Sequence, residues 1–65
     1  MLEGAVRDRV IAEQNELRDK ITKLALFIYS ERINTVSKEH ASLLKTQLHI
    51  MEEYDEILTE RLELD

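Results

Sequence analysis

Cysteine and proline are absent from this chain of 65 residues, and glycine occurs once, at Gly4. The lack of cysteine excludes disulfides and thiolate metal sites. The lack of proline leaves the interior of the sequence without a residue that would break a helix. Leucine, glutamate, lysine, arginine and alanine are abundant, and all five favour helices. The composition therefore predicts an all-α protein.

Long apolar runs are also missing. The longest one, Leu24 to Tyr29, is far shorter than the roughly 20 residues that span a bilayer. The N-terminus lacks the apolar segment of a signal peptide. From these two absences we expect a soluble intracellular protein that has no membrane partner.

A surplus of positive charge is absent as well. The net charge of −5 argues against general binding of DNA, RNA or anionic membranes. The charges are unevenly placed, because every charged residue from Glu52 onward is acidic except Arg61. Arg61 is therefore a candidate for a special role.

The residue patterns of common active sites are not found either. His40 and His49 fall on opposite sides of a helix, so they cannot share a metal within one chain. Neither follows a glutamate by three positions, as di-metal helical bundles require. No HExxH and no Ser–His–Asp arrangement is present. The sequence predicts a protein that is not an enzyme and that has no metal or cofactor.

What the chain does have is helical periodicity. From Val6 onward, two lines of mostly apolar residues form one seam on a helix. These lines are Val10, Leu17 and Leu24, and Gln14, Ile21 and Ile28. Gln14 interrupts the seam, and two interpretations stay open. It is either a buried polar residue that fixes register, or an exposed residue near a frayed end.

A second helix is expected after a turn. The weaker periodicity before Ser37 marks the turn, and Ser37 is a plausible N-cap with Glu39 in the first turn that follows. The fold class is thus an all-α, antiparallel two-helix hairpin in a single domain. The predicted parts are a lead-in over 1–5, a helix over about 6–30, a turn over about 31–37 and a helix over about 38–63.

The second helix carries more apolar surface than a hairpin buries. One line packs naturally against the first helix, and a second line lies about 100° further round. The first line is Leu44, Met51 and Leu58, and the second is Leu43, Ile50, Ile57 and Leu64. An exposed stripe of this length normally marks an interface, so we expect a homo-oligomer or a protein complex. A competing interpretation packs both lines against a broad first helix.

A mixed stripe follows one side of the first helix. Its members are Arg9, Glu13, Glu16, Lys20, Lys23 and Phe27. In one interpretation these are solvated ion pairs, Arg9 with Glu13, Lys20 with Glu16 and Lys23 with Asp19, each contributing about 0.2–0.5 kcal/mol. In the other, the three cations meet their copies across an interface and bind a phosphate-bearing ligand.

Arg61 has two interpretations of the same kind. Its stem could lie on Ile57, Leu58 and Leu64 with its head near Asp65, as long cationic side chains often do. Alternatively, its guanidinium lies at an interface and binds a phosphate or a base edge.

The order of these residues resembles a known family. The patterns are Arg9-Val10-Ile11-x-Glu13, Leu17-x-x-Lys20-Ile21-x-Lys23-Leu24-x-x-Phe27-Ile28, and Leu43-Leu44-x-x-Gln47-x-x-x-Met51-x-x-Tyr54-x-x-x-Leu58-x-x-Arg61-Leu62. They are similar to those of the helical-hairpin sponges of phages, which include the anti-CBASS protein and a domain of one type of anti-Thoeris protein. The resemblance implies a homohexamer in the host cytoplasm. Its implied function is to sequester cyclic di- and trinucleotides without cleaving them.

The resemblance also implies which residues bind. Lys20 resembles the lysine that meets dinucleotide phosphate, and Thr22 and Arg61 resemble the threonine and arginine of a separate trinucleotide pocket. The family's dinucleotide site adds an aromatic residue near the N-terminus, and residues 5–9 contain none. Arg7 or Arg9 would then have to stack on the base instead.

Two other functional classes fit the same residues. One is a coiled-coil interaction or scaffolding protein without a small ligand, in which Lys20, Lys23 and Arg61 all face water. The other is a small regulator that docks one apolar stripe on a host enzyme.

Overall fold

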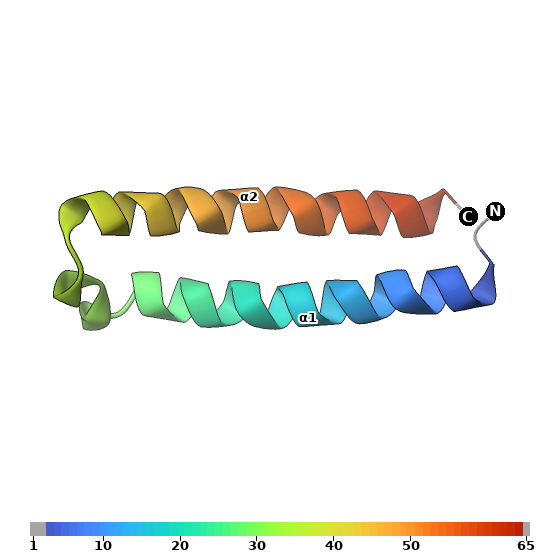
Figure 1. Ribbon diagram of the computed structural model, residues 1–65, viewed down its shortest axis with the longest axis horizontal. Helices are drawn as coiled ribbons and strands as arrows, with labels where there is room; N and C mark the ends of the chain where they lie inside the picture. Colours follow the sequence, from blue (N-terminus) through green and yellow to red (C-terminus); the bar gives the residue numbers. More distant parts are fainter. Residues whose placement is uncertain (1–2, 65) are drawn as a thin grey trace.

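Two long antiparallel helices make up almost the whole molecule, which a computed structural model describes over residues 3–64. Helix α1 spans Gly4–Ile28, a short 3-10 helix η1 spans Glu31–Thr35, and helix α2 spans Lys38–Glu63. The helices lie side by side with both termini at one end, giving a rod of 45 × 15 × 13 Å (Figure 1). The predicted all-α hairpin is confirmed. Within residues 3–64, no helix has the length and apolar character that a membrane span needs.

The start of α1 differs from the prediction. Gly4 and Ala5 are helical, whereas a lead-in was expected there; Met1 and Leu2 lie outside the described residues. The Arg7 N–H donates to the Glu3 carbonyl at 2.8 Å, which closes the first turn. A glycine costs about 1 kcal/mol inside a helix, and less at its first position, where one turn of hydrogen bonds holds it.

The turn is more regular than its weak periodicity indicated. α1 ends at Ile28 rather than near residue 30, and η1 follows within two residues. The Ser30 hydroxyl accepts from the Arg32 N–H at 3.2 Å and donates to the Phe27 carbonyl at 2.9 Å. One serine thus ties the end of α1 to the start of η1.

The start of α2 agrees with the prediction. The Ser37 hydroxyl accepts from the His40 N–H at 3.1 Å, which is the N-cap geometry expected of this residue. Glu39 lies in the first turn, where the helix dipole favours an acid.

The core is a thin seam along the facing sides of the helices. Val10, Leu17 and Leu58 are buried together, and Leu58 has no exposed surface. The partly buried residues packed against them are Ile21, Met51 and Leu62. Apart from Leu62, one turn beyond Leu58, these residues belong to the seam of the first helix and the first line of the second helix, so that pairing is confirmed.

Gln14 is buried within this seam, with 6% of its surface exposed. Its side-chain amide donates to the Thr59 hydroxyl at 2.7 Å and to the Asp55 carbonyl at 3.4 Å. The interpretation of Gln14 as an exposed residue near a frayed end is therefore wrong. Because a buried amide costs free energy unless it is hydrogen-bonded, this contact favours the observed register of α1 on α2.

Candidate ligand-binding surfaces

The hairpin has two long faces. Polar contacts between the side chains of the two helices distinguish one face from the other. Gln14 bonds to Thr59, and Arg18 Nε lies 2.9 Å from Asp55 Oδ1. We call the side that carries these contacts the bridged face. A step of two residues turns about 200° round a helix, so Lys20 and Ile57 lie on the opposite side. We call that side the stripe face; its residues are Arg9, Glu13, Glu16, Lys20, Leu43, Ile50, Tyr54, Ile57, Arg61 and Leu64, with Lys23 at its outer edge.

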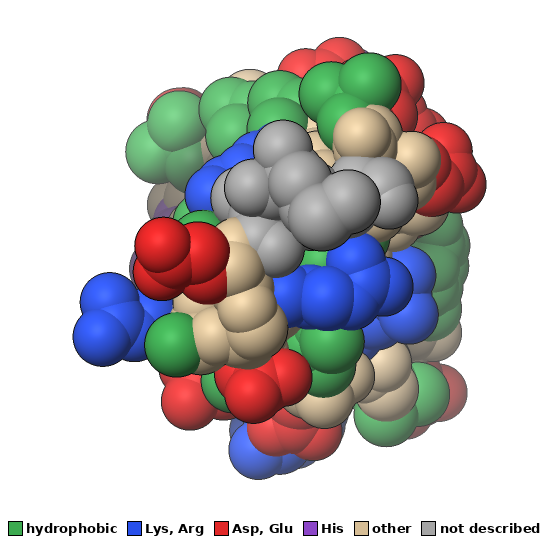
Figure 2. All heavy atoms as spheres, turned by 90° about the vertical axis from the view of Figure 1, so that its right-hand side faces the viewer, with side chains coloured by type: hydrophobic (Ala, Val, Ile, Leu, Met, Phe, Trp, Pro, Cys, Tyr) green, Lys and Arg blue, Asp and Glu red, His purple; other side chains and the backbone are tan. Residues whose placement is uncertain are grey.

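The second apolar line of α2 remains exposed on the stripe face. The exposed fractions are 68% for Leu43, 58% for Ile50, 52% for Ile57 and 88% for Leu64. The interpretation that packed both lines against α1 is therefore wrong, because the narrow seam of α1 covers only one of them. In the end view of Figure 2, hydrophobic side chains gather at the upper left, where α2 lies, and acidic ones at the upper right.

The cations of α1 on this face are exposed, and within residues 3–64 two of the three have no ion pair. Lys23 Nζ pairs with Asp19 Oδ2 at 3.0 Å, as predicted. Among residues 3–64, the other two predicted pairs, Arg9 with Glu13 and Lys20 with Glu16, do not form ion pairs within 4 Å. Of the three ion pairs predicted along this stripe, the described residues therefore form the one between Lys23 and Asp19. Arg9 and Lys20 keep their charges available to a ligand or a second chain.

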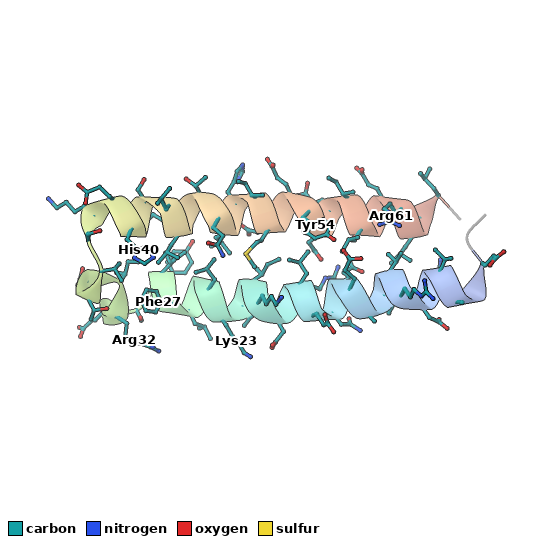
Figure 3. The ribbon with its side chains drawn as sticks, viewed as in Figure 1. Lys23, Phe27, Arg32, His40, Tyr54 and Arg61 are labelled. Atoms are coloured by element: carbon teal, nitrogen blue, oxygen red, sulfur yellow. The ribbon has the colours of Figure 1, made fainter. Side chains whose placement is uncertain are left out.

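Arg61 is exposed as well. It follows Thr59 by two positions, which places it on the stripe face, near the termini (Figure 3). Within the described part of the chain its guanidinium has no carboxylate within 4 Å, and the predicted contact with Asp65 lies outside that part. Its surroundings on α2 include Ile57 and Leu64, both exposed.

Thr22 lies on the bridged face, in an open groove of about 390 Å³. Arg18, Ile21, Thr22, Glu52, Asp55 and Glu56 line this groove. The Thr22 hydroxyl donates to the Arg18 carbonyl at 3.0 Å, and the Arg18 guanidinium is paired with Asp55. With three carboxylates around one paired cation, the groove of a single chain repels phosphate.

Arg7 also lies on this side of the hairpin. Its Nη1 donates to the Leu62 carbonyl at 3.3 Å, near the end of α2. Arg7 and Arg9 therefore face different ways, and only Arg9 lies on the same face as Lys20. Of the two arginines proposed to replace the missing aromatic, Arg9 is the better placed for a ligand held by Lys20.

One chain does not bring the predicted binding residues together. Thr22 and Arg61 lie on opposite faces, and the Arg18–Asp55 contact sets their levels along the rod. Thr22 is four residues beyond Arg18 toward the turn, and Arg61 is six beyond Asp55 toward the termini. At 1.5 Å per residue their separation along the axis is about 15 Å. Two such residues can meet one small ligand only if they come from different chains.

A third surface lies at the turn, and the sequence did not indicate it. An open hollow of about 640 Å³ is lined by Lys23, Leu26, Phe27, Ser30 and Arg32. The Arg32 guanidinium carbon lies 5.2 Å from the centre of the Phe27 ring, within cation–π range. Arg32 and Ser30 were missed because their contacts cross a turn whose conformation helical periodicity does not specify.

The acidic side chains of residues 3–64 do not gather into a metal site. Over residues 3–64, no group of three or more histidine, aspartate or glutamate residues is arranged to hold a metal ion. His49 pairs instead with Glu53 at 3.0 Å, one turn along α2.

The chain is similar to a known protein family along most of its length. Neither curated proteins nor solved structures contain a significant relative. A family model described as Sequestin matches residues 5–64, which covers both helices and the turn. Because this match spans nearly the whole chain, the protein belongs to the Sequestin family.

Proposed function

We propose that the protein is a phage anti-defence sponge, which binds cyclic oligonucleotide second messengers in the host cytoplasm and releases them unchanged. Cyclic trinucleotides are the first ligand class and cyclic dinucleotides the second. The family name itself points to sequestration of a ligand. Sequestration needs only binding, because a messenger held in a pocket cannot reach its effector.

The observation that carries this proposal is the stripe face. It places Lys20 and Arg61, which have no carboxylate within 4 Å among residues 3–64, beside an exposed apolar line. Exposed apolar surface favours association, and association would surround these cations with protein. Phosphate contacts become stronger where water is excluded. The pocket would therefore form where copies of the chain meet.

The chemistry of a cyclic trinucleotide suits a shared pocket. It carries three phosphodiester anions around a ring, so copies related by a three-fold axis could each supply one guanidinium. Arg61 can bind a phosphate through two parallel N–H bonds. The Thr22 hydroxyl, which is exposed, has free lone pairs for a further hydrogen bond.

Calorimetric titration with a panel of cyclic di- and trinucleotides tests this proposal. We expect tight binding of at least one cyclic trinucleotide, and the ligand recovered after denaturation should be intact. Arg61→Ala should abolish trinucleotide binding without changing the mass of the assembly. Lys45→Ala removes an exposed cation of α2 outside the stripe face and should bind normally. The absence of heat across the panel would overturn the proposal.

A scaffolding coiled coil is the second candidate. The observation in its favour is that Lys20, Lys23 and Arg61 are all exposed in the single hairpin. In that case the protein would form a dimer or four-helix bundle, and no cyclic nucleotide would raise its unfolding temperature. A ligand at about 100 times its dissociation constant should add about 2.7 kcal/mol of apparent stability, which a thermal-shift assay detects.

A further inference from the structure

The hollow at the turn has the composition of an anion site. Lys23 and Arg32 are on its wall, and none of its five lining residues is acidic. Figure 3 shows both cations on the side of the molecule that faces away from α2. In a chain with a net charge of −5, a hollow lined by two cations and by no acidic residue is a local exception; the neighbouring Asp19 carboxylate pairs with Lys23 at 3.0 Å.

The same hollow offers an aromatic and apolar wall. Phe27 is half-buried and Leu26 is 68% exposed. The guanidinium carbon of Arg32 lies over the Phe27 ring, 5.2 Å from its centre. A guanidinium group can also stack on a nucleobase, as it does in RNA-binding sites.

The backbone at Arg32 is held by hydrogen bonds within the turn. Its backbone N–H donates to the Ser30 hydroxyl at 3.2 Å, and that hydroxyl donates to the Phe27 carbonyl at 2.9 Å. The Arg32 carbonyl accepts from the Thr35 hydroxyl at 2.7 Å. These three bonds hold the backbone on both sides of Arg32, so binding orders less of the chain.

Lys23 is held less firmly. Its partner Asp19 lies one turn back on α1, and both side chains are mostly exposed. Exposed ion pairs of this kind contribute little stability, so Lys23 can exchange Asp19 for a phosphate at small cost. The C-terminal end of α1 carries a negative partial charge, which disfavours an anion here. An anion site at this place therefore needs two cations.

From these contacts we infer that the hollow is a second nucleotide site, for a linear nucleoside monophosphate with its phosphate on Lys23 and its base on Arg32. This inference is independent of the proposed function, because every residue of the hollow comes from one chain. A phosphate alone would use the cations and leave the stacking surface empty. A nucleoside monophosphate would use both.

Titration of the full chain with adenosine 5′-monophosphate, followed by amide NMR spectra, tests the inference. We expect the shifts to concentrate on residues 23–32, and inorganic phosphate to bind more weakly. Arg32→Ala should raise the dissociation constant about tenfold or more, which is within the usual cost of losing one base-stacking contact. Arg32→Lys keeps the positive charge and loses the planar guanidinium group. Its dissociation constant should lie between those of the parent chain and Arg32→Ala.

The controls separate this site from the cyclic nucleotide pockets. Lys45→Ala removes one positive charge outside the hollow and should bind adenosine 5′-monophosphate like the parent chain. Arg61→Ala should do the same, even though it should lose cyclic trinucleotides. The inference is overturned if no shifts occur near the turn, if phosphate binds as tightly as the nucleotide, or if Arg32→Ala binds normally.

Discussion

At the scale of single residues, burial separates neighbours along α2 that look alike in the sequence. Leu58 has no exposed surface, whereas 52% of Ile57 is exposed, although both are large aliphatic residues. Helical periodicity predicted this difference, because residue types and the 3.6-residue repeat are enough to identify the core line. Periodicity did not decide whether Gln14 is buried. That depends on Thr59, a partner on the other helix.

Truncation of the Leu58 side chain should strongly destabilise the hairpin. Leu58→Ala leaves a cavity at the centre of the core, which typically costs about 2–5 kcal/mol. A single core in a chain of this size supplies roughly 3–5 kcal/mol, so the hairpin should be largely unfolded when it is not assembled. Circular dichroism at low protein concentration measures this. Ile57→Ala is the matched control, and equal loss of helix in both variants would contradict the assignment of the core.

The Gln14 amide should contribute measurably to stability. Gln14→Ala removes the bonds to Thr59 and Asp55 and leaves a small cavity, so we expect a loss of about 1–3 kcal/mol in urea unfolding. Asn15→Ala, at the next and exposed position, should change stability by less than about 0.5 kcal/mol. If Gln14→Ala is as stable as the parent chain, the hydrogen bonds of Gln14 do not contribute to stability.

At the scale of elements, the order and type of the two helices were predictable, and their ends less so. Ser37 marks the start of α2 because a serine hydroxyl satisfies a free backbone N–H. No comparable signal marks the end of α1, where the Ser30 contacts produce η1 instead of further α-helix. Which residues share each face of the hairpin could not be predicted from the sequence, because it depends on which sides of the two helices meet.

Removal of the α2 cap tests this element directly. Ser37→Ala should cost about 1 kcal/mol, because the His40 N–H loses its acceptor. The cost should appear as a lower midpoint of thermal unfolding. Ser42→Ala, on an exposed position inside α2, is the control and should leave the midpoint unchanged or slightly higher. An equal effect of both changes would mean that Ser37 does not act as a cap.

At the scale of the whole molecule, the exposed line of α2 is the dominant feature. Its presence was predicted from sequence, and its exposure is confirmed. The number of copies that cover it stays a prediction, as does the sharing of a pocket between them. One chain holds Thr22 and Arg61 on opposite faces, so a small ligand that contacts both residues has to lie between copies of the chain.

A charge placed on the line should split the assembly. Ile50→Glu sets a carboxylate where association would bury it unpaired, which is costly, so we expect a smaller species with unchanged helix content. Ser42→Glu adds the same charge at an exposed position outside the stripe face and should assemble normally. Size-exclusion chromatography compares the two. If Ile50→Glu keeps the parent mass, the line is not the interface.

The most direct test of the account is the mass of the purified chain by light scattering at micromolar concentration. The account predicts a stable multiple of the 7.7 kDa chain mass, six by the family resemblance, which persists when a cyclic trinucleotide is added. A well-behaved monomer of 7.7 kDa, with the α2 line exposed to solvent, would contradict both the assembly and the pockets proposed between its copies.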